Sequence, residues 1–290
     1  MKKFLMIFWG VIFSLGLSNN INALTINYND FQDLSQFTLN GATGSISNPV
    51  YFNGAYVLRL TNNYDQRGSA FLTNSITISS DYSFSTFFSF QITHSARKYS
   101  WIEKGADGLT FTIQTNSANV GGGGGSLGYG GIQNSLAIEY DTYYNYWKDP
   151  NGNHIGIDLN GNIQSKATKN IFPDFNNGQI WYTWIDYNGT TDTLEVRISQ
   201  ENTRPNDPDL SYLVDLGTIF GTNVAYVGFT SGTGDSMGWH DIREWIFVDN
   251  YSPINNVPEP CTLLLIGSGL IGVIGIRKRM KNNNTSPLKF

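Results

Sequence analysis

The amino-acid sequence predicts an all-β domain built as an antiparallel sandwich. Apolar and polar residues alternate with period two in many short segments, and turns rich in Gly, Asn and Asp separate these segments. No segment between the two ends of the chain carries a convincing helical stripe of apolar residues. Period two is the side-chain repeat of a β-strand, and many short strands joined by such turns are typical of a sandwich. We therefore expect the concave face or the loops of this sandwich to carry the function.

Three segments show the strand pattern clearly. Residues 109–114 alternate strictly between apolar and polar side chains, and in 136–141 the large apolar residues alternate with Ala137, Glu139 and Asp141, which predicts strands with one buried face. Residues 84–92 follow the same pattern, but Thr86 and Phe87 break it. We therefore expect this strand to be partly buried on both faces.

A hairpin is predicted near residue 188. Residues 181–187 and 193–199 both read as strands, and Asn188-Gly189 lies between them. Asn-Gly is a strong hairpin signal because glycine accepts the positive φ that a tight turn needs. We expect Gly189 to adopt such a φ.

The N-terminal residues 1–23 have the layout of a secretory signal peptide. Lys2 and Lys3 precede an apolar run over residues 4–17, and small and polar residues follow up to Ala23. Such a run is short for a membrane-spanning helix. An uncleaved N-terminal anchor is the alternative reading.

The C-terminal end resembles the PEP-CTERM sorting signal of Gram-negative bacteria. A linker at 251–256 leads to Val257-Pro258-Glu259-Pro260, an apolar run over 261–276 and a basic cluster up to Lys281. The resemblance implies a hydrophobic, transiently membrane-anchored helix in segment 257–281, cleavage by an exosortase, and a cytoplasmic tail at 282–290. A plain C-terminal anchor is the alternative.

Charge and cysteine content restrict the function of the remaining domain. Seven of the 18 basic residues and one of the 23 acidic residues lie in the two end segments, which leaves 11 basic and 22 acidic residues and a net charge near −11. An acidic domain is a poor nucleic-acid binder, because phosphate contacts need clustered Lys and Arg. The only cysteine is Cys261, so the domain has no disulfide.

One stretch near the middle of the chain carries potential metal ligands. Glu139 and Asp141 are two apart on a predicted strand, so both carboxylates project from one face. Asn145 and Asp149 add oxygen donors from a loop, and His154 follows. Oxygen ligands suit calcium, whereas imidazole with carboxylates suits a transition ion such as manganese or zinc. We expect two neighbouring sites that share Asp141 and Asp149; ordinary solvated loop acids are the alternative.

This stretch resembles the metal loop of legume (L-type) lectins, and the resemblance covers residues 24–250. It implies a concanavalin-like jelly-roll sandwich that binds Ca²⁺ and Mn²⁺ or another transition ion. By this resemblance the transition ion is held by Glu139, Asp141, Asp149 and His154. The same resemblance implies that calcium is held by Asp141, the backbone carbonyl of Tyr143, Asn145 and Asp149.

The same resemblance implies a carbohydrate site. Ala106-Asp107-Gly108 is similar to a family motif in which a cis peptide bond precedes the aspartate and the aspartate accepts hydrogen bonds from sugar hydroxyls. Gly125 lies in a segment similar to the family's glycine loop, in which a backbone N–H donates a hydrogen bond to the sugar. Tyr143 would lie under the sugar ring, Asn145 would bind hydroxyls, and Gly234 would contact the sugar from loop 231–238, which sets sugar preference. A glycine-rich linker and a core tyrosine are the alternative readings.

The sequence thus predicts a metal-dependent lectin, not an enzyme, that is exported to the cell surface or extracellular matrix. The domain could also pair as a homodimer through a sheet edge. Two other functions stay open. A glycoside hydrolase on the same sandwich needs a second glutamate just after Asp141, where Thr142, Tyr143 and Tyr144 stand instead. A structural adhesin with a degenerate sugar site is the other alternative.

Overall fold

The structure, a computed structural model, describes residues 24–79, 81–98, 105–118 and 121–255. The predicted signal peptide at 1–23, the sorting segment at 257–281 with its hydrophobic helix, and the tail at 282–290 lie outside the described residues. Within the described ranges, no helix is long and apolar enough to cross a membrane.

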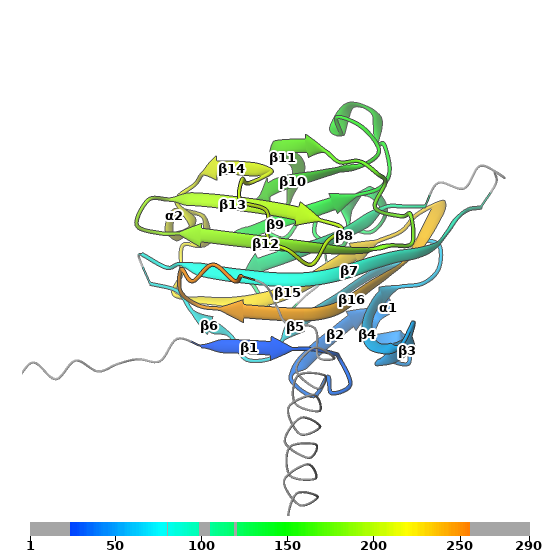
Figure 1. Cartoon of the computed structure of the whole chain (residues 1–290), viewed down its shortest axis with the longest axis horizontal. Coiled ribbons are helices and arrows are strands. Elements are labelled where there is room, and N and C mark those ends of the chain that lie inside the picture. Colours follow the sequence, from blue (N-terminus) through cyan, green and yellow to red (C-terminus); the bar gives the residue numbers. More distant parts are fainter. Residues whose placement is uncertain (1–23, 80, 99–104, 119–120, 256–290) are drawn as a thin grey trace, which may run out of the picture.

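Two eight-stranded antiparallel sheets face each other in this domain (Figure 1), which confirms the predicted all-β sandwich. The first sheet runs β14 (Leu210–Leu213), β13 (Thr193–Ser199), β12 (Ile180–Asn188), β7 (Phe84–Arg97), β16 (Ser236–Val248), β4 (Ala55–Thr61) and β3 (Val50–Phe52), with β1 (Thr25–Tyr28) paired to β16. The second runs β11 (Asn162–Asn170), β10 (His154–Leu159), β9 (Ser135–Asp141), β8 (Gly108–Gln114), β15 (Val224–Gly232), β5 (Arg67–Leu72) and β2 (Phe37–Gly41), with β6 (Ile76–Thr77) paired to β15.

Aromatic side chains fill the space between the sheets. Phe88 of β7 is fully buried, and its ring centroid lies 5.0 Å from that of Phe229 and 5.7 Å from that of Tyr140 on the opposite sheet. Both pairs meet edge to face, an arrangement that the ring quadrupoles favour. The hydroxyl of Tyr140 is satisfied by a hydrogen bond with Thr183 of β12, 2.7 Å away. This contact ties the second sheet to the first close to the strand end that carries the site.

The burial of β7 agrees with the prediction, whereas that of β8 and β9 does not. Residues 84–92 of β7 are buried on both faces, as expected. All residues of β8 and β9 are buried as well, although one polar face of each was expected in solvent. On β9 the loop at 121–132 contributes, because its residues Tyr129 and Ile132 pack on Ala137. The buried hydroxyl of Thr110 is satisfied there by Thr230 at 2.8 Å.

The predicted hairpin joins β12 to β13, but the reason given for its glycine is wrong. Asn188 pairs with Thr193, so four residues form the loop, and it is Asp192 that has a positive φ of 54°. Gly189 is needed for a different reason. A Cβ atom on this residue would collide with the backbone carbonyl of Tyr82, which lies against the turn.

Short helices, which the sequence reading did not predict, complete the fold. The α-helices α1 (Ala42–Ser45) and α2 (Leu216–Phe220) are single turns, as are the 3₁₀ helices η1 (Gly124–Ser126) and η2 (Tyr146–Lys148). A single turn is too short to show an apolar stripe. Capping residues carry the signal instead, since the Asp215 side chain accepts from Thr218 N at 3.0 Å and Gly221 ends α2 in the left-handed region.

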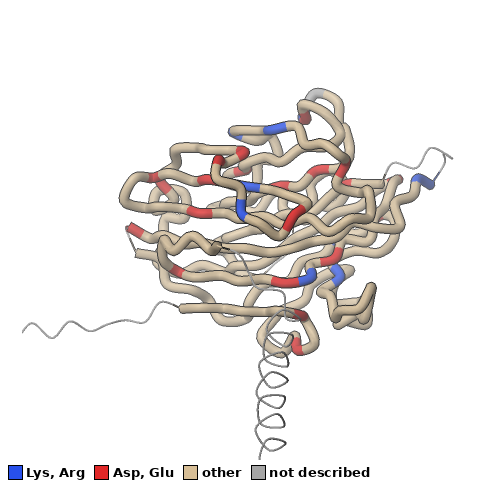
Figure 2. The backbone as a smooth tube through the Cα atoms, in the orientation of Figure 1, with Lys and Arg blue, Asp and Glu red and all other residues tan. Residues whose placement is uncertain are grey.

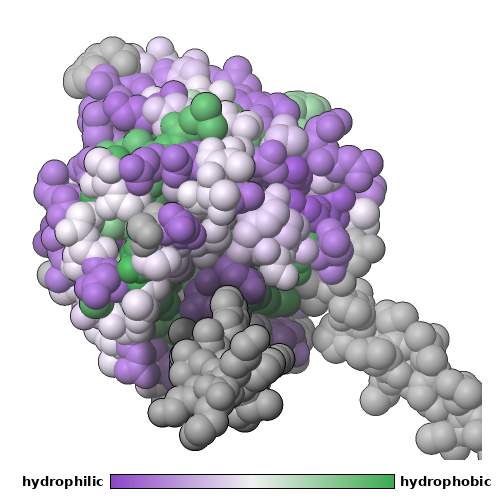
Figure 3. All heavy atoms as spheres, turned by 90° about the vertical axis from the view of Figure 1, so that its left-hand side faces the viewer, coloured by the Kyte–Doolittle hydropathy of each residue, from purple (hydrophilic) through white to green (hydrophobic). Residues whose placement is uncertain are grey.

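Several loops meet at one end of the sandwich. The register places Gly108 opposite Asp141, and Asp141 opposite His154, so β8, β9 and β10 begin or end together. The end of β7 meets the start of β16 at the same end, on the right in Figure 1. The opposite end is mostly hydrophilic, with small separate apolar patches (Figure 3). Lys and Arg are few and dispersed along the chain in Figure 2.

Candidate metal centre and adjoining carbohydrate site

A buried cluster of potential metal ligands lies where β9 and β10 meet. Glu139 and Asp141 project from one face of β9, as predicted, and His154 projects beside them from β10. One ligand atom from each residue lies within 4.8 Å of the other two. His154 Nε2 is 3.1 Å from Glu139 Oε1, and both side chains are at least 97% buried.

Gly156 makes room for this cluster. It pairs with Glu139 across the two strands, and a Cβ atom on it would collide with the Glu139 carboxylate and with Ser165. Ser165 of β11 donates its hydroxyl to the same carboxylate. The glycine two residues after His154 therefore has a steric reason, which sequence reasoning did not identify.

Asp158 is a member of this acidic cluster that the sequence reading missed. It is fully buried, and it lies on the same face of β10 as His154 because the two are four residues apart on a strand. Burial raises the pKa of its carboxyl well above the usual range, and the charge of Glu139 adds to the effect. The period-two rule applied to residues 154–158 would have found it.

The electrostatics of the cluster fit a bound divalent cation. Burial raises the pKa of Asp141 well above its usual range, and the charges of Glu139 and Asp149 raise it further. His154 Nδ1 is buried and has no hydrogen-bond partner among the described residues. Converging buried carboxylates repel one another and lose hydration, so they are stable as anions only with a compensating cation. Oxygen and imidazole donors are the set that a transition ion accepts.

The loop after β9 brings the remaining predicted ligands close. Asp149 is half-buried and accepts a hydrogen bond from Asn145 N at 2.6 Å, while Asp141 accepts one from Tyr143 N at 2.7 Å. Asp149 lies outside the tightest group of ligand atoms, but its charge raises the pKa of both Asp141 and Asp107. The metal role of the Tyr143 carbonyl stays a prediction.

Asp107 stands at the junction of this loop with β8. The Ala106–Asp107 peptide bond is cis, as the family resemblance implied. Asp107 N donates to Gly232 O at 3.0 Å, and Asp107 O accepts from Thr142 N at 2.8 Å. The Oδ2 atom is buried and lacks a hydrogen-bond partner among the described residues. Burial, and then the charge of Asp149, raises the pKa of Asp107 to about 7.

Gly234 lies beside Asp107, and the neighbouring glycines Gly124 and Gly125 lie beside Asp107 and Asn145 respectively. A Cβ atom on Gly234 would lie 3.6 Å from Asp107 Oδ2, and one on Gly125 would lie 2.6 Å from the amide of Asn145. A side chain at Gly125 would therefore overlap Asn145. Asn145 Oδ1 is a second buried acceptor without a hydrogen-bond partner in the described part of the chain.

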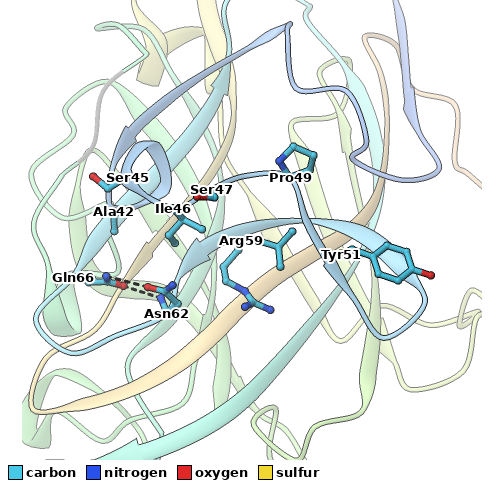
Figure 4. Close-up of a pocket in the computed structure, with 10 residues that line it drawn as sticks. Ala42, Ser45, Ile46, Ser47, Pro49, Tyr51, Arg59, Asn62 and Gln66 are labelled. Atoms are coloured by element: carbon cyan, nitrogen blue, oxygen red, sulfur yellow. Dashed lines mark hydrogen bonds between the residues drawn. The ribbon is translucent and has the colours of Figure 1, made fainter.

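Loop 231–238 is held in place by a turn that the sequence reading did not single out. Thr233 Oγ1 accepts from Gln66 N at 2.9 Å and donates to Asn63 O at 2.6 Å, and Gly234 O accepts from Asp65 N at 3.1 Å. Within this turn, Gln66 donates from Nε2 to Asn62 Oδ1 at 3.2 Å, and its Oε1 accepts from Asn62 N at 2.7 Å (Figure 4). The position of Gly234 therefore depends on the turn at 62–66.

A hollow of about 580 Å³ lies on the far side of this turn, between α1 and the β3–β4 hairpin (Figure 4). Arg59 lines it, with its guanidinium paired to Asp241 at 2.7 Å and stacked 3.9 Å from the centre of a Trp239 ring. None of the predicted site residues lines this hollow. The loops around Asp107 are therefore the candidate site.

Comparison with known protein families decides the family. The legume lectin domain matches residues 23–260, and the PEP-CTERM protein-sorting motif matches residues 256–279. The chain belongs to the legume lectin family. This lectin is 33% identical over 246 residues to the L-type lectin-domain containing receptor kinase VIII.1 of Arabidopsis thaliana. The match covers 81% of this chain and 29% of the relative. It is 34% identical over 175 residues to the seed lectin of Styphnolobium japonicum, and this match covers 57% of this chain and 56% of the relative.

Solved structures confirm the jelly-roll sandwich that the resemblance implied. A lectin from Bauhinia forficata in complex with GalNAc superposes with a TM-score of 0.64 at 26% identity, over 79% of this chain and 99% of that one. Winged bean acidic lectin complexed with methyl-alpha-D-galactose superposes with a TM-score of 0.66 at 28% identity, over 79% of this chain and 99% of that one. The lectin spans between 24% and 56% of the length of the first curated relatives that it matches.

Proposed function

We propose that this lectin is a metal-dependent carbohydrate-binding protein. The observation that carries the proposal is the pair of buried acceptors, Asp107 Oδ2 and Asn145 Oδ1, which lack hydrogen-bond partners among the described residues. A buried acceptor without a donor costs about 1–3 kcal/mol, so such atoms at a surface site are ready to accept hydroxyl groups. The glycines beside them leave the space that a ligand needs.

The roles follow from the positions of the groups. Asp107 and Asn145 would accept hydrogen bonds from sugar hydroxyls, and the backbone N–H of Gly125 would donate one. Gly234, in loop 231–238, would contact the sugar and limit which sugars fit. Tyr143 is half-buried, and its ring would cover the apolar face of the pyranose. Bound Ca²⁺ and Mn²⁺, or another transition ion, would neutralise the carboxylates and hold the loop that carries Tyr143 and Asn145.

The geometry favours binding over hydrolysis. A glycosidase needs two carboxylates that reach both sides of a scissile bond. Here Glu139 is 3% exposed and contacts His154 and Ser165, so it is engaged inside the cluster. The adhesin alternative, with a degenerate site, is less well supported because Asp107 and Asn145 still converge.

A glycan array on the purified 24–250 fragment tests the proposal. We expect saturable binding to a restricted set of glycans, with galactose-type sugars included because relatives were solved with GalNAc and methyl-alpha-D-galactose. Competition with free sugar should release the lectin from the array. A metal-loaded, folded fragment that binds no glycan would refute the proposal.

We also propose that the lectin is exported and delivered to the cell surface. The sorting motif at 256–279 supports this route, and an exosortase is the expected processing partner. Mass spectrometry of the protein from its producing cells should find a C-terminus near Pro258–Pro260. Mature protein that retains residues 277–290 would contradict it. Self-association of the domain as a homodimer stays a prediction.

A further inference from the structure

Two connections cross from one sheet to the other side by side at the end of the sandwich that carries the candidate site. The turn at 62–66 links β4 to β5, and residues 233–235 link β15 to β16. β4 pairs with β16 in the first sheet, and β5 pairs with β15 in the second. The two connections are therefore neighbours at both of their ends. Gly234, the proposed sugar contact, lies in the second connection.

Thr233 bonds the second connection to the first. Its side chain is buried, with the residue 1% exposed. The backbone N–H of Thr233 donates to Gln66 O at 2.9 Å, and its hydroxyl accepts from Gln66 N at 2.9 Å and donates to Asn63 O at 2.6 Å. Asp65 N adds a hydrogen bond to Gly234 O at 3.1 Å. The N–H and the hydroxyl of Thr233 are thus both committed to the turn at 62–66.

The turn at 62–66 is itself fixed to the first sheet. Gln66 Oε1 accepts from Asn62 N at 2.7 Å and from Asn63 N at 2.9 Å, which closes the turn on its own side chain. Trp239 Nε1 donates to Asn62 O at 3.1 Å. The Trp239 ring is in turn stacked 3.9 Å from the buried guanidinium of Arg59, which lies beside Asn62 and Gln66 in Figure 4. Thr233 is therefore bonded to a rigid partner.

Loop 231–238 depends on such outside support because three of its eight residues are glycine. Glycine loses more conformational freedom on ordering than any other residue. Larger residues would not fit here, since a Cβ atom on Gly232 would collide with Gly124 O and one on Gly234 would lie 3.6 Å from Asp107 Oδ2. A site whose loops are already ordered binds without the entropic cost of ordering them.

We propose that Thr233 is a positioning residue that sets the sugar preference of the lectin without contacting the sugar. This inference rests on the proposed function, since Gly234 would contact a sugar bound at Asp107. Thr233 holds Gly234 at one place beside Asp107, so a sugar with a hydroxyl in the wrong orientation does not fit. A loosened Gly234 discriminates less, and it binds the preferred sugar more weakly because the loop must first be ordered.

Titration calorimetry on the full chain, detergent-solubilised and loaded with Ca²⁺ and Mn²⁺, tests the inference. The probes are the best monosaccharide from the array and a weaker-binding epimer of it. Thr233→Val exchanges the hydroxyl for a methyl group and removes two hydrogen bonds. We expect the preferred sugar to bind about tenfold more weakly and the epimer to change by about twofold at most. Thr233→Ser keeps the hydroxyl and should restore the preference.

Thr86→Val is the matched control. Thr86 is also 1% exposed, and its hydroxyl donates to Ile246 O at 2.7 Å and accepts from Trp245 Nε1 at 3.0 Å, near the other end of β7. The two Val variants lose the same kind of hydroxyl, so both should lower the melting temperature. Only Thr233→Val should change the ratio of the two sugar affinities.

Gln66→Leu approaches the same contact from the other connection. It removes the acceptor that closes the turn at 62–66, so it should shift the affinity ratio in the same direction as Thr233→Val, and it replaces that variant if Thr233→Val does not fold. An affinity ratio unchanged in folded Thr233→Val or Gln66→Leu with metal content intact would overturn the inference. An equal shift in Thr86→Val would do the same. Failure of the unchanged lectin to bind either sugar would instead refute the proposed function.

Discussion

Removal of the Ca²⁺ and transition ion that we propose to be bound is expected to abolish carbohydrate binding and to lower the melting temperature of the lectin. A metal that binds only the folded state and is present at a free concentration of about 100 times its Kd stabilises that state by about 2.7 kcal/mol. In a domain of this size this corresponds to about 5–10 °C in melting temperature. Without them, Glu139, Asp141 and Asp158 are left together in a buried site. Their repulsion would loosen the loop that carries Tyr143 and Asn145, and the sugar site with it.

The pH dependence of this effect has a definite sign. Burial and neighbouring charges raise the pKa of Asp141 in the metal-free protein, so this carboxyl holds its proton to higher pH than usual. A metal needs the ionised carboxylate and a neutral imidazole at His154, so its binding releases protons. Affinity for the cations should therefore fall as the pH is lowered from 8 to 5, and acid should mimic chelation.

Differential scanning calorimetry and sugar titration before and after exhaustive chelation measure both effects. Elemental analysis must show that the metals have left, and adding Ca²⁺ with Mn²⁺ should restore both properties. Sugar affinity that is unchanged in a protein shown to be metal-free would contradict the metal dependence. The proposed carbohydrate site would then bind sugar without a metal.

Replacing Asp107 is expected to remove sugar binding and to leave the metals in place. Its Oδ2 atom is the buried acceptor on which Gly234 and the glycine loop converge, and hydrogen bonds to a charged group contribute about 1.5–3 kcal/mol each. Loss of two such bonds in Asp107→Ala should weaken sugar binding by about a hundredfold or more. The close ligand group Glu139, Asp141 and His154 does not include Asp107, so metal content should not change.

Titration calorimetry with the preferred sugar and metal analysis on the same sample give the two readouts. Asp107→Asn keeps the shape of the side chain and tests whether the carboxylate itself is needed. Asp207→Ala, at an exposed aspartate in the loop before β14, is the matched control and should leave both readouts unchanged. Normal sugar binding by Asp107→Ala would show that the site has been assigned wrongly.

The metal cluster was predictable from sequence because its members are close along two paired strands. Glu139 and Asp141 share a face by the period-two rule, and His154 begins the neighbouring strand. Asp158 obeys the same rule and was within reach of the sequence reading. The turn at 62–66 that holds loop 231–238 was not, because the two segments lie far apart in the sequence and no local pattern links them.

The sequence by itself determined the five strands β7, β8, β9, β12 and β13, the turn between β12 and β13, and the residue types of both candidate sites. Alternation and spacing are local properties, and backbone geometry converts them directly into faces of a sheet. Only the tertiary structure decided which polar faces are buried, since loop 121–132 packs on Ala137 of β9 and Thr110 of β8 is buried against Thr230 of β15. Only it decided that Gly234 meets Asp107 across 127 positions of chain. The pairing of β15 with β8 brings those two loops together, and such pairing depends on the packing of the whole core.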